Sequence, residues 1–234
     1  MLYESQYHIP RYGQLYENAT DHRASYTYIR QLLQLRQWRM RAAEAIATGG
    51  ERYIAPRTWV LKSPMHLESS EALLHALPEG FTLVRMHRNP VKVILSLSTM
   101  LAYIQALQSD SPKPAEILDY WTRRIERMLR KSDADDAMLR ASDKVKVIDL
   151  DYEDLIRNPA AVAAGVLEDA GLQVTDDVRQ RLSAYVDAHP RNLTGGGRFA
   201  YGLSVFNSTK WPDEAAIARH FEFYTQAKKG SSLS

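Results

Sequence analysis

The sequence of 234 residues contains no cysteine. Disulfide cross-links, thiolate nucleophiles and zinc sites built on cysteine are therefore excluded. This absence fits a reducing compartment, and residues 1–16 lack the apolar core of an export signal, so we expect a cytoplasmic protein. No run of about eighteen apolar residues occurs either, and we expect no membrane-spanning helix.

A large excess of charge of one sign is also missing, because 30 Lys and Arg stand against 28 Asp and Glu. We therefore expect no nucleic-acid partner. The phosphate-binding patterns GxxxxGK[ST] and GxGxxG are absent. The seven histidines show neither HxH nor HExxH spacing, so we expect no metal site.

Short apolar runs alternate with longer amphipathic segments, which predicts an α/β fold. We expect a small parallel sheet with helices on its faces and helix content well above strand content. Three strands are predicted at residues 58–61, 81–86 and 145–150. Helices are predicted at residues 26–48, 67–77, 90–107, from 115 onward, and at 151–156, 160–170, 176–188 and 214–227.

The run FTLVRMHRNPVKVILSL joins a predicted strand to a predicted helix through Asn89-Pro90. Proline is favoured at the first position of a helix, so Arg88 should lie at the carboxyl end of the strand, beside a helix N-terminus. Free N–H groups at such an end attract anions, and ligands of open α/β sheets bind at this edge. The segment predicts a phosphate site; the alternative is that Arg88 pairs with a carboxylate.

A second basic group follows the strand predicted at residues 58–61, in the run Lys62-Ser63-Pro64-Met65-His66. If both strands are parallel, Lys62 and Arg88 meet at one edge of the sheet, where two cations suit a polyanionic ligand. Alternatively, Lys62 is a solvated turn residue and His66 a polar residue on the next helix.

Two further segments could contribute to such a site. Acidic residues cluster at 149–154, where we favour a structural role because carboxylates stabilise helix N-termini. Tyr152 lies among them and could stack on a base or belong to the core. Glycines 195–197 precede Arg198, and their backbone N–H groups could approach a phosphate, although three glycines are also typical of a linker.

Four segments in this order, WVLKSPMHL, VRMHRNPVKVILSL, DLDYEDLIRNP and GGGRFAYGLSVFN, resemble the sulfotransferase superfamily, in particular its bacterial-type members. The resemblance covers residues 7 to 228. It implies one sulfotransferase-like domain over residues 1–228, of the three-layer P-loop-NTPase-like type, followed by a disordered tail at 229–234.

The resemblance also implies the cofactor 3′-phosphoadenosine 5′-phosphosulfate (PAPS), the product adenosine 3′,5′-bisphosphate and a small-molecule or peptide acceptor. Arg88 and Ser96 would bind the 3′-phosphate, and Tyr152 would lie against the adenine. Lys62 would neutralise charge near the 5′-phosphosulfate, and Arg198 would close over the 3′-phosphate.

Two departures from the family pattern matter. The Gly- and Ser/Thr-rich loop that holds the 5′-phosphosulfate in this family is not found, so we expect an N-terminally truncated domain with an incomplete sheet. The position two residues after the lysine, histidine in cytosolic relatives, is Pro64, which leaves His66 or Glu68 as the catalytic base. Removing one transition-state donor typically costs about 10²–10³ in rate, so we expect weak nucleotide binding and little turnover.

Two alternative functions stay open. One is a non-catalytic α/β binding or interaction module derived from the sulfotransferase fold. The other is a nucleotide kinase, which the absent Walker lysine makes the weaker candidate.

Overall fold

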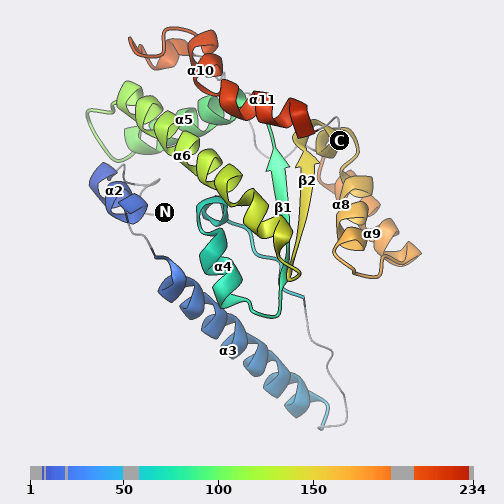
Figure 1. Ribbon diagram of the computed structural model, residues 1–234. Coiled ribbons are helices and arrows are strands. Elements are labelled where there is room, and N and C mark those ends of the chain that lie inside the picture. Colours follow the sequence, from blue (N-terminus) through green and yellow to red (C-terminus); the bar gives the residue numbers. More distant parts are fainter. Residues whose placement is uncertain (1–6, 8, 19–20, 50–57, 191–202, 232–234) are drawn as a thin grey trace.

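The computed structural model describes residues 7, 9–18, 21–49, 58–190 and 203–231. Helices dominate the described chain, and they surround one small sheet (Figure 1). The strands are β1 (Phe81–His87) and β2 (Val145–Asp151). The helices are α2 (Pro10–Asn18), α3 (Arg23–Ala47), the 3-10 helix η1 (Pro64–Glu68), α4 (Ser70–Ala76), α5 (Pro90–Ala106), α6 (Pro114–Ala141), α7 (Tyr152–Arg157), α8 (Pro159–Asp169), α9 (Asp176–Ala188), the 3-10 helix η2 (Leu203–Val205), α10 (Glu214–His220) and α11 (Glu222–Ser231).

β1 and β2 pair in parallel, with Phe81 opposite Val145 and His87 opposite Asp151. In Figure 1, α6 lies on one side of this pair and α8 and α9 lie on the other. Both strands end at the same edge, and each continues directly into a helix there. The predicted α/β architecture of three layers with a small parallel sheet and predominant helices is therefore confirmed.

The strand predicted at residues 58–61 is wrong. The segment has no strand conformation, and the side chain of Val60 is 85% exposed. Apolar β-branched residues favour a strand only when a neighbouring strand accepts their backbone hydrogen bonds, and within the described residues β1 pairs with β2 alone. Lys62 therefore follows an irregular segment, and the expected placement at the end of a parallel strand is wrong as well.

Helix starts follow local signals that the sequence carries. Asn89 caps α5 by accepting a hydrogen bond from the Val91 backbone N–H at 2.9 Å, and Pro90 occupies the first helical position. Asp151 caps α7 in the same way, through the N–H of Glu153 at 2.7 Å. These two caps position the loops at the carboxyl edge of the sheet.

The main core lies between α5, α6 and the C-terminal helices. Ile94, Ile117 and Leu118 are buried there, and four aromatic or apolar side chains from the C-terminal segment complete the cluster: Phe206, Trp211, Ile217 and Phe221. The single helix predicted at 214–227 is divided in two, because the chain turns at the fully buried Phe221. α11 continues to Ser231, so the predicted tail overlaps its end; the domain limits stay a prediction.

Candidate nucleotide site

The carboxyl ends of β1 and β2 bring two predicted cofactor residues into contact. Arg88 follows β1 directly, and Tyr152 is the first residue of α7 after β2. The Arg88 guanidinium lies over the Tyr152 ring, with its carbon 4.3 Å from the ring centroid. Both side chains are half-buried. A cation is attracted to the face of an aromatic ring, so this contact stabilises the proximity of the two strand ends.

Ser96 lies on the same face of α5 as Lys92. It stands one turn after Lys92, and residues four apart share a helix face. The Lys92 ammonium is 3.9 Å from a carboxylate oxygen of Glu153, the residue next to Tyr152. Ser96 is half-buried. The helix surface that carries it therefore borders the first turn of α7, which contains Tyr152.

Within the part of the chain that the structure describes, the charge of Arg88 is not compensated by an acid. Its Nε atom is buried and has no hydrogen-bond partner, and no ion pair joins this guanidinium to a carboxylate of the described chain. The alternative interpretation, that Arg88 serves a structural ion pair, is therefore not supported. An anion bound at the start of the helix would accept a hydrogen bond from this buried N–H group, which otherwise has no acceptor.

His66 lies in η1, away from Arg88, and contacts a different aromatic ring. Its Nδ1 atom is 2.8 Å from the hydroxyl of Tyr26, which lies at the start of α3. Burial lowers the pKa of His66 and so favours its neutral form, while burial raises the pKa of Tyr26 to about 12. A neutral imidazole is able to accept a proton. Lys62, two residues before η1, is exposed.

Glu68, the other candidate base, is held in a buried ion pair. The Arg124 side chain of α6 is 1% exposed and donates two hydrogen bonds to the Glu68 carboxylate, one of them at 2.7 Å. Glu17 of α2 approaches the Arg124 Nε atom to 3.2 Å. Because both Glu68 oxygens are engaged by the guanidinium, His66 is the freer of the two candidate bases.

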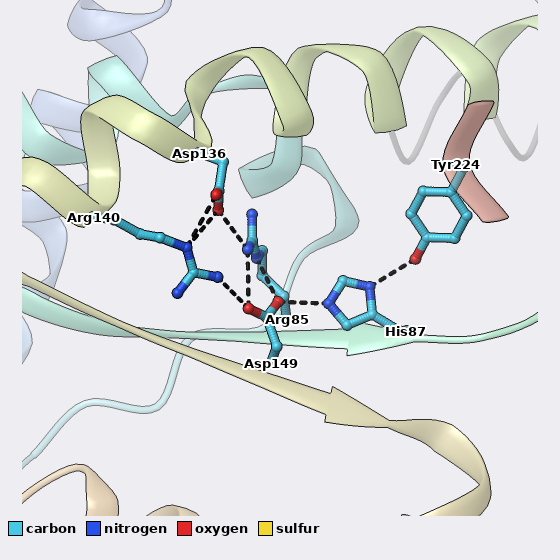
Figure 2. Close-up of polar contacts among 6 residues, drawn as sticks. All are labelled: Arg85, His87, Asp136, Arg140, Asp149 and Tyr224. Carbon is cyan, nitrogen blue, oxygen red and sulfur yellow. Dashed lines mark hydrogen bonds and ion pairs between the residues drawn. The ribbon is translucent and has the colours of Figure 1, made fainter. Parts of the chain in front are cut away.

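A charged network lies on the sheet face beneath α6 (Figure 2). Arg85 of β1 is almost fully buried and donates to Asp149, its register partner on β2, at 2.9 and 3.1 Å. Asp136 of α6 contacts Arg85 at 2.6 Å, and Arg140 donates to both Asp136 and Asp149. Burial opposes ionisation of Asp149, yet the hydrogen bonds from Arg85 and His87 outweigh it and hold the pKa of Asp149 well below its ordinary value.

His87 connects this network to the C-terminal helix α11, as Figure 2 shows. Its Nε2 atom lies 2.5 Å from Asp149 and its Nδ1 atom lies 2.7 Å from the Tyr224 hydroxyl. A carboxylate can only accept, so Nε2 carries a hydrogen, and in the neutral imidazole Nδ1 accepts from the Tyr224 hydroxyl. Burial raises the pKa of Tyr224 to about 12, so its hydroxyl keeps its proton. The residue before Arg88 is thus fixed by two partners.

Sequence reasoning did not find this network. The available signal was the alternation along β1, which places Arg85 and His87 on the same face as Leu83. Polar side chains that face the core require hydrogen-bond partners, and Asp149, opposite Arg85 on the neighbouring strand, is such a partner. The predicted structural role of the acidic cluster is supported, because Asp151 caps α7 and Glu153 and Asp154 lie in its first turn.

Several other features delimit the site. Arg198 and glycines 195–197 lie outside the described residues. Within the described ranges, no group of three His or acidic side chains could hold a metal ion, and no helix has the length and apolarity to cross a membrane. A cavity of about 830 Å³ opens between α2, α4 and α6 and is lined mostly by charged side chains. It includes Glu68 and Ser69 but neither Arg88 nor Tyr152, so it is separate from the strand ends.

Comparison with known proteins bears on this geometry. The fold is similar to that of the crystal structure of sulfotransferase STF9 from Mycobacterium avium, with a TM-score of 0.72 and 23% sequence identity. The match covers 97% of this chain and 52% of the mycobacterial chain, so the present sequence spans about half of that relative's length. No curated protein matches. The family model for the sulfotransferase family matches residues 2–176, about three quarters of the sequence, and the chain therefore belongs to the sulfotransferase family.

Proposed function

We propose that this chain forms the nucleotide 3′-phosphate site and part of the transfer site of a PAPS-dependent sulfotransferase. Such an enzyme moves a sulfuryl group to the hydroxyl or amine of a small-molecule or peptide acceptor. Membership of the family supports the reaction class. The carrying observation is the uncompensated guanidinium of Arg88 at the start of α5.

The residues at the strand ends fit the nucleotide. The buried Nε atom of Arg88 lacks a partner, which a phosphate oxygen would supply. The Ser96 hydroxyl, on the surface of α5 that borders the first turn of α7, would add a neutral donor. Since the Arg88 guanidinium covers one face of the Tyr152 ring, an adenine would use the opposite face. No carboxylate of the described chain competes for this guanidinium.

The remaining predicted residues would act at the reacting end. When bound, PAPS supplies the sulfuryl group, and stabilising negative charge on the leaving phosphate is the main task of the protein. Lys62 is exposed and positively charged, and it would serve that task. For His66 to act as the base, its Nδ1–H would donate to the Tyr26 hydroxyl oxygen, which leaves the lone pair of Nε2 to take the acceptor's proton.

A nucleotide titration tests the proposal. Thermal shift and isothermal calorimetry should compare adenosine 3′,5′-bisphosphate with 5′-AMP, which lacks the 3′-phosphate. We expect millimolar or weaker binding that depends on the 3′-phosphate, because the loop for the 5′-phosphosulfate is missing from the sequence. Arg88→Gln should weaken it about tenfold or more, as expected for a charge-assisted hydrogen bond of about 1.5–3 kcal/mol.

The matched control is Arg181→Gln, an exposed arginine on α9 whose partner is Asp177. Equal binding of the two nucleotides, or equal effects of the two substitutions, would contradict the proposal. Binding of adenosine 3′,5′-bisphosphate without measurable sulfuryl transfer from PAPS would instead favour the second candidate, a non-catalytic module that retains the nucleotide site.

A further inference from the structure

Helix α3 stands apart from the rest of the molecule. It has 25 residues, so it is about 37 Å long at 1.5 Å per residue. Among the described elements its main neighbour is α4. Figure 1 shows α3 extending away from the sheet and beyond α4, where no other labelled helix accompanies it. Most of its surface is therefore not covered by any element that the structure describes.

The two sides of α3 differ in composition. The side chains turned toward the protein recur at helical spacing and are partly or fully buried: Tyr26, Arg30, Leu33, Gln37, Met40 and Glu44. At about 100° per residue, the opposite half of the circumference carries large apolar side chains. These are Tyr28, Leu32, Leu35, Trp38 and Ile46, and all are exposed, with values of 52% for Leu35, 65% for Trp38 and 84% for Ile46. Ile29, which is 37% exposed, lies at the edge of this surface.

Positive charge accompanies this apolar half. α3 contains five arginines and a single carboxylate, Glu44, which lies on the inner side. The whole chain has only two more basic than acidic residues, so its positive excess resides in this helix. Arg23 and Arg30 pair with Asp21 and Glu79. The other three arginines, Arg36, Arg39 and Arg41, are exposed, and none makes an ion pair with a described residue.

We propose that the outer half of α3 is a docking surface for an anionic lipid bilayer, with the helix lying in the plane of the interface. Interfacial helices combine a broad apolar half containing Trp, Tyr and Leu with arginines that reach lipid phosphates. Arg36 and Arg39 extend from the apolar side itself, and long arginine stems reach the headgroups while their methylenes remain among apolar groups. No spanning segment is required.

Two other occupants fit less well. A second copy of α3 would bring two arginine-bearing surfaces together, and the outer half offers no carboxylate to compensate that repulsion. An acidic partner helix would need only a narrow apolar seam, whereas the exposed apolar side chains here spread over about half of the helix circumference. The width of the apolar surface and its uncompensated charge favour an extended anionic surface.

Vesicle sedimentation with the 234-residue chain tests this inference independently of any nucleotide. We expect binding to vesicles of 70% phosphatidylcholine and 30% phosphatidylglycerol at 50 mM salt. Binding to pure phosphatidylcholine vesicles should be much weaker, and binding to the anionic ones should fall as salt screens the arginines. The triple variant Arg36→Gln/Arg39→Gln/Arg41→Gln should lose about fivefold in partitioning per arginine.

Apolar variants separate membrane insertion from electrostatic adhesion. Leu32→Gln/Leu35→Gln should reduce partitioning at least tenfold while the thermal midpoint stays unchanged, because both side chains are exposed. The matched control is Leu107→Gln, which is 87% exposed and lies outside α3. Absence of binding to anionic vesicles, or equal partitioning of the α3 and control variants, would overturn the inference. A concentration-dependent dimer abolished by Leu32→Gln/Leu35→Gln would overturn it too, in favour of a contact between copies.

Discussion

The buried pair of Glu68 and Arg124 gives a quantitative prediction about stability. Breaking a buried ion pair from one side leaves an uncompensated charge and costs about 3–5 kcal/mol. Glu68→Met should cost about 3 kcal/mol, the low end, because the Glu17 carboxylate 3.2 Å from Arg124 still compensates part of the charge. Arg124→Met should cost about 5 kcal/mol, since no other described cation pairs with Glu68.

The double variant Glu68→Met/Arg124→Met should be more stable than either single one. Replacing both partners by unbranched apolar side chains removes the two buried charges together, and such replacements are often neutral. We expect the double variant to lose less than about 2 kcal/mol in its free energy of unfolding. The sum of the two single losses would then exceed the loss in the double variant by far more than it does for independent sites. Urea unfolding monitored by circular dichroism measures the free energy of unfolding of the unmodified chain and of the three variants. The dependence of that free energy on urea concentration should be the same for all four proteins.

Two results would refute this reasoning. Additive losses in the double variant would mean that the two side chains do not act as a pair. A loss below about 1 kcal/mol for Glu68→Met would mean that the carboxylate is solvated, as exposed ion pairs are, and would restore Glu68 as a candidate base. An Arg124→Met chain that is unfolded alone but folded with the second substitution would support the coupling.

Three further predictions concern single side chains. Tyr224→Phe removes the hydrogen bond to His87 from a buried position and should cost about 1–2 kcal/mol in urea unfolding, whereas Tyr185→Phe on the exposed surface of α9 should cost almost nothing. Burial lowers the pKa of His66, so the unfolded chain binds the proton more tightly than the folded chain. Stability should therefore fall as the pH drops below about 6.5. His66→Asn should reduce this dependence of the thermal midpoint on pH in melts between pH 7 and 5. Gly80→Ala should cost at least about 2 kcal/mol in the same unfolding assay, because φ is +96° and a Cβ would meet the Lys144 carbonyl oxygen at 2.5 Å; full stability would contradict the turn geometry.

Features of the fold that depend on local chemistry were predictable from the sequence. The start of α5 was expected because Asn89 and Pro90 each favour a helix N-terminus for a reason that involves only neighbouring backbone groups. The parallel direction of the strands followed from their alternation with helices, although which strands pair did not. The contact of Arg88 with Tyr152 fits that arrangement, since both residues follow strands that end at one edge.

Features that depend on distant partners were not predictable. Residues 58–61 have strand composition, but pairing decides whether such a segment is a strand. The partner of His87 is Tyr224, 137 residues away, and no spacing rule connects them. Likewise, Phe221 interrupts the last predicted helix because its ring fits into the core of α5 and α6, which helical periodicity does not reveal.

The position of the C-terminal aromatic residues also constrains how the chain folds during synthesis. Phe206, Trp211 and Phe221 complete a core whose other members, on α5 and α6, are made about a hundred residues earlier. While the ribosome is still producing α8 and α9, the apolar side of the α5–α6 hairpin has nothing to cover it. Contacts between segments so far apart in sequence form slowly, and intermediates with uncovered apolar surface are prone to aggregate. The nascent protein would thus need protection, by a chaperone for example, until residues 206–221 emerge.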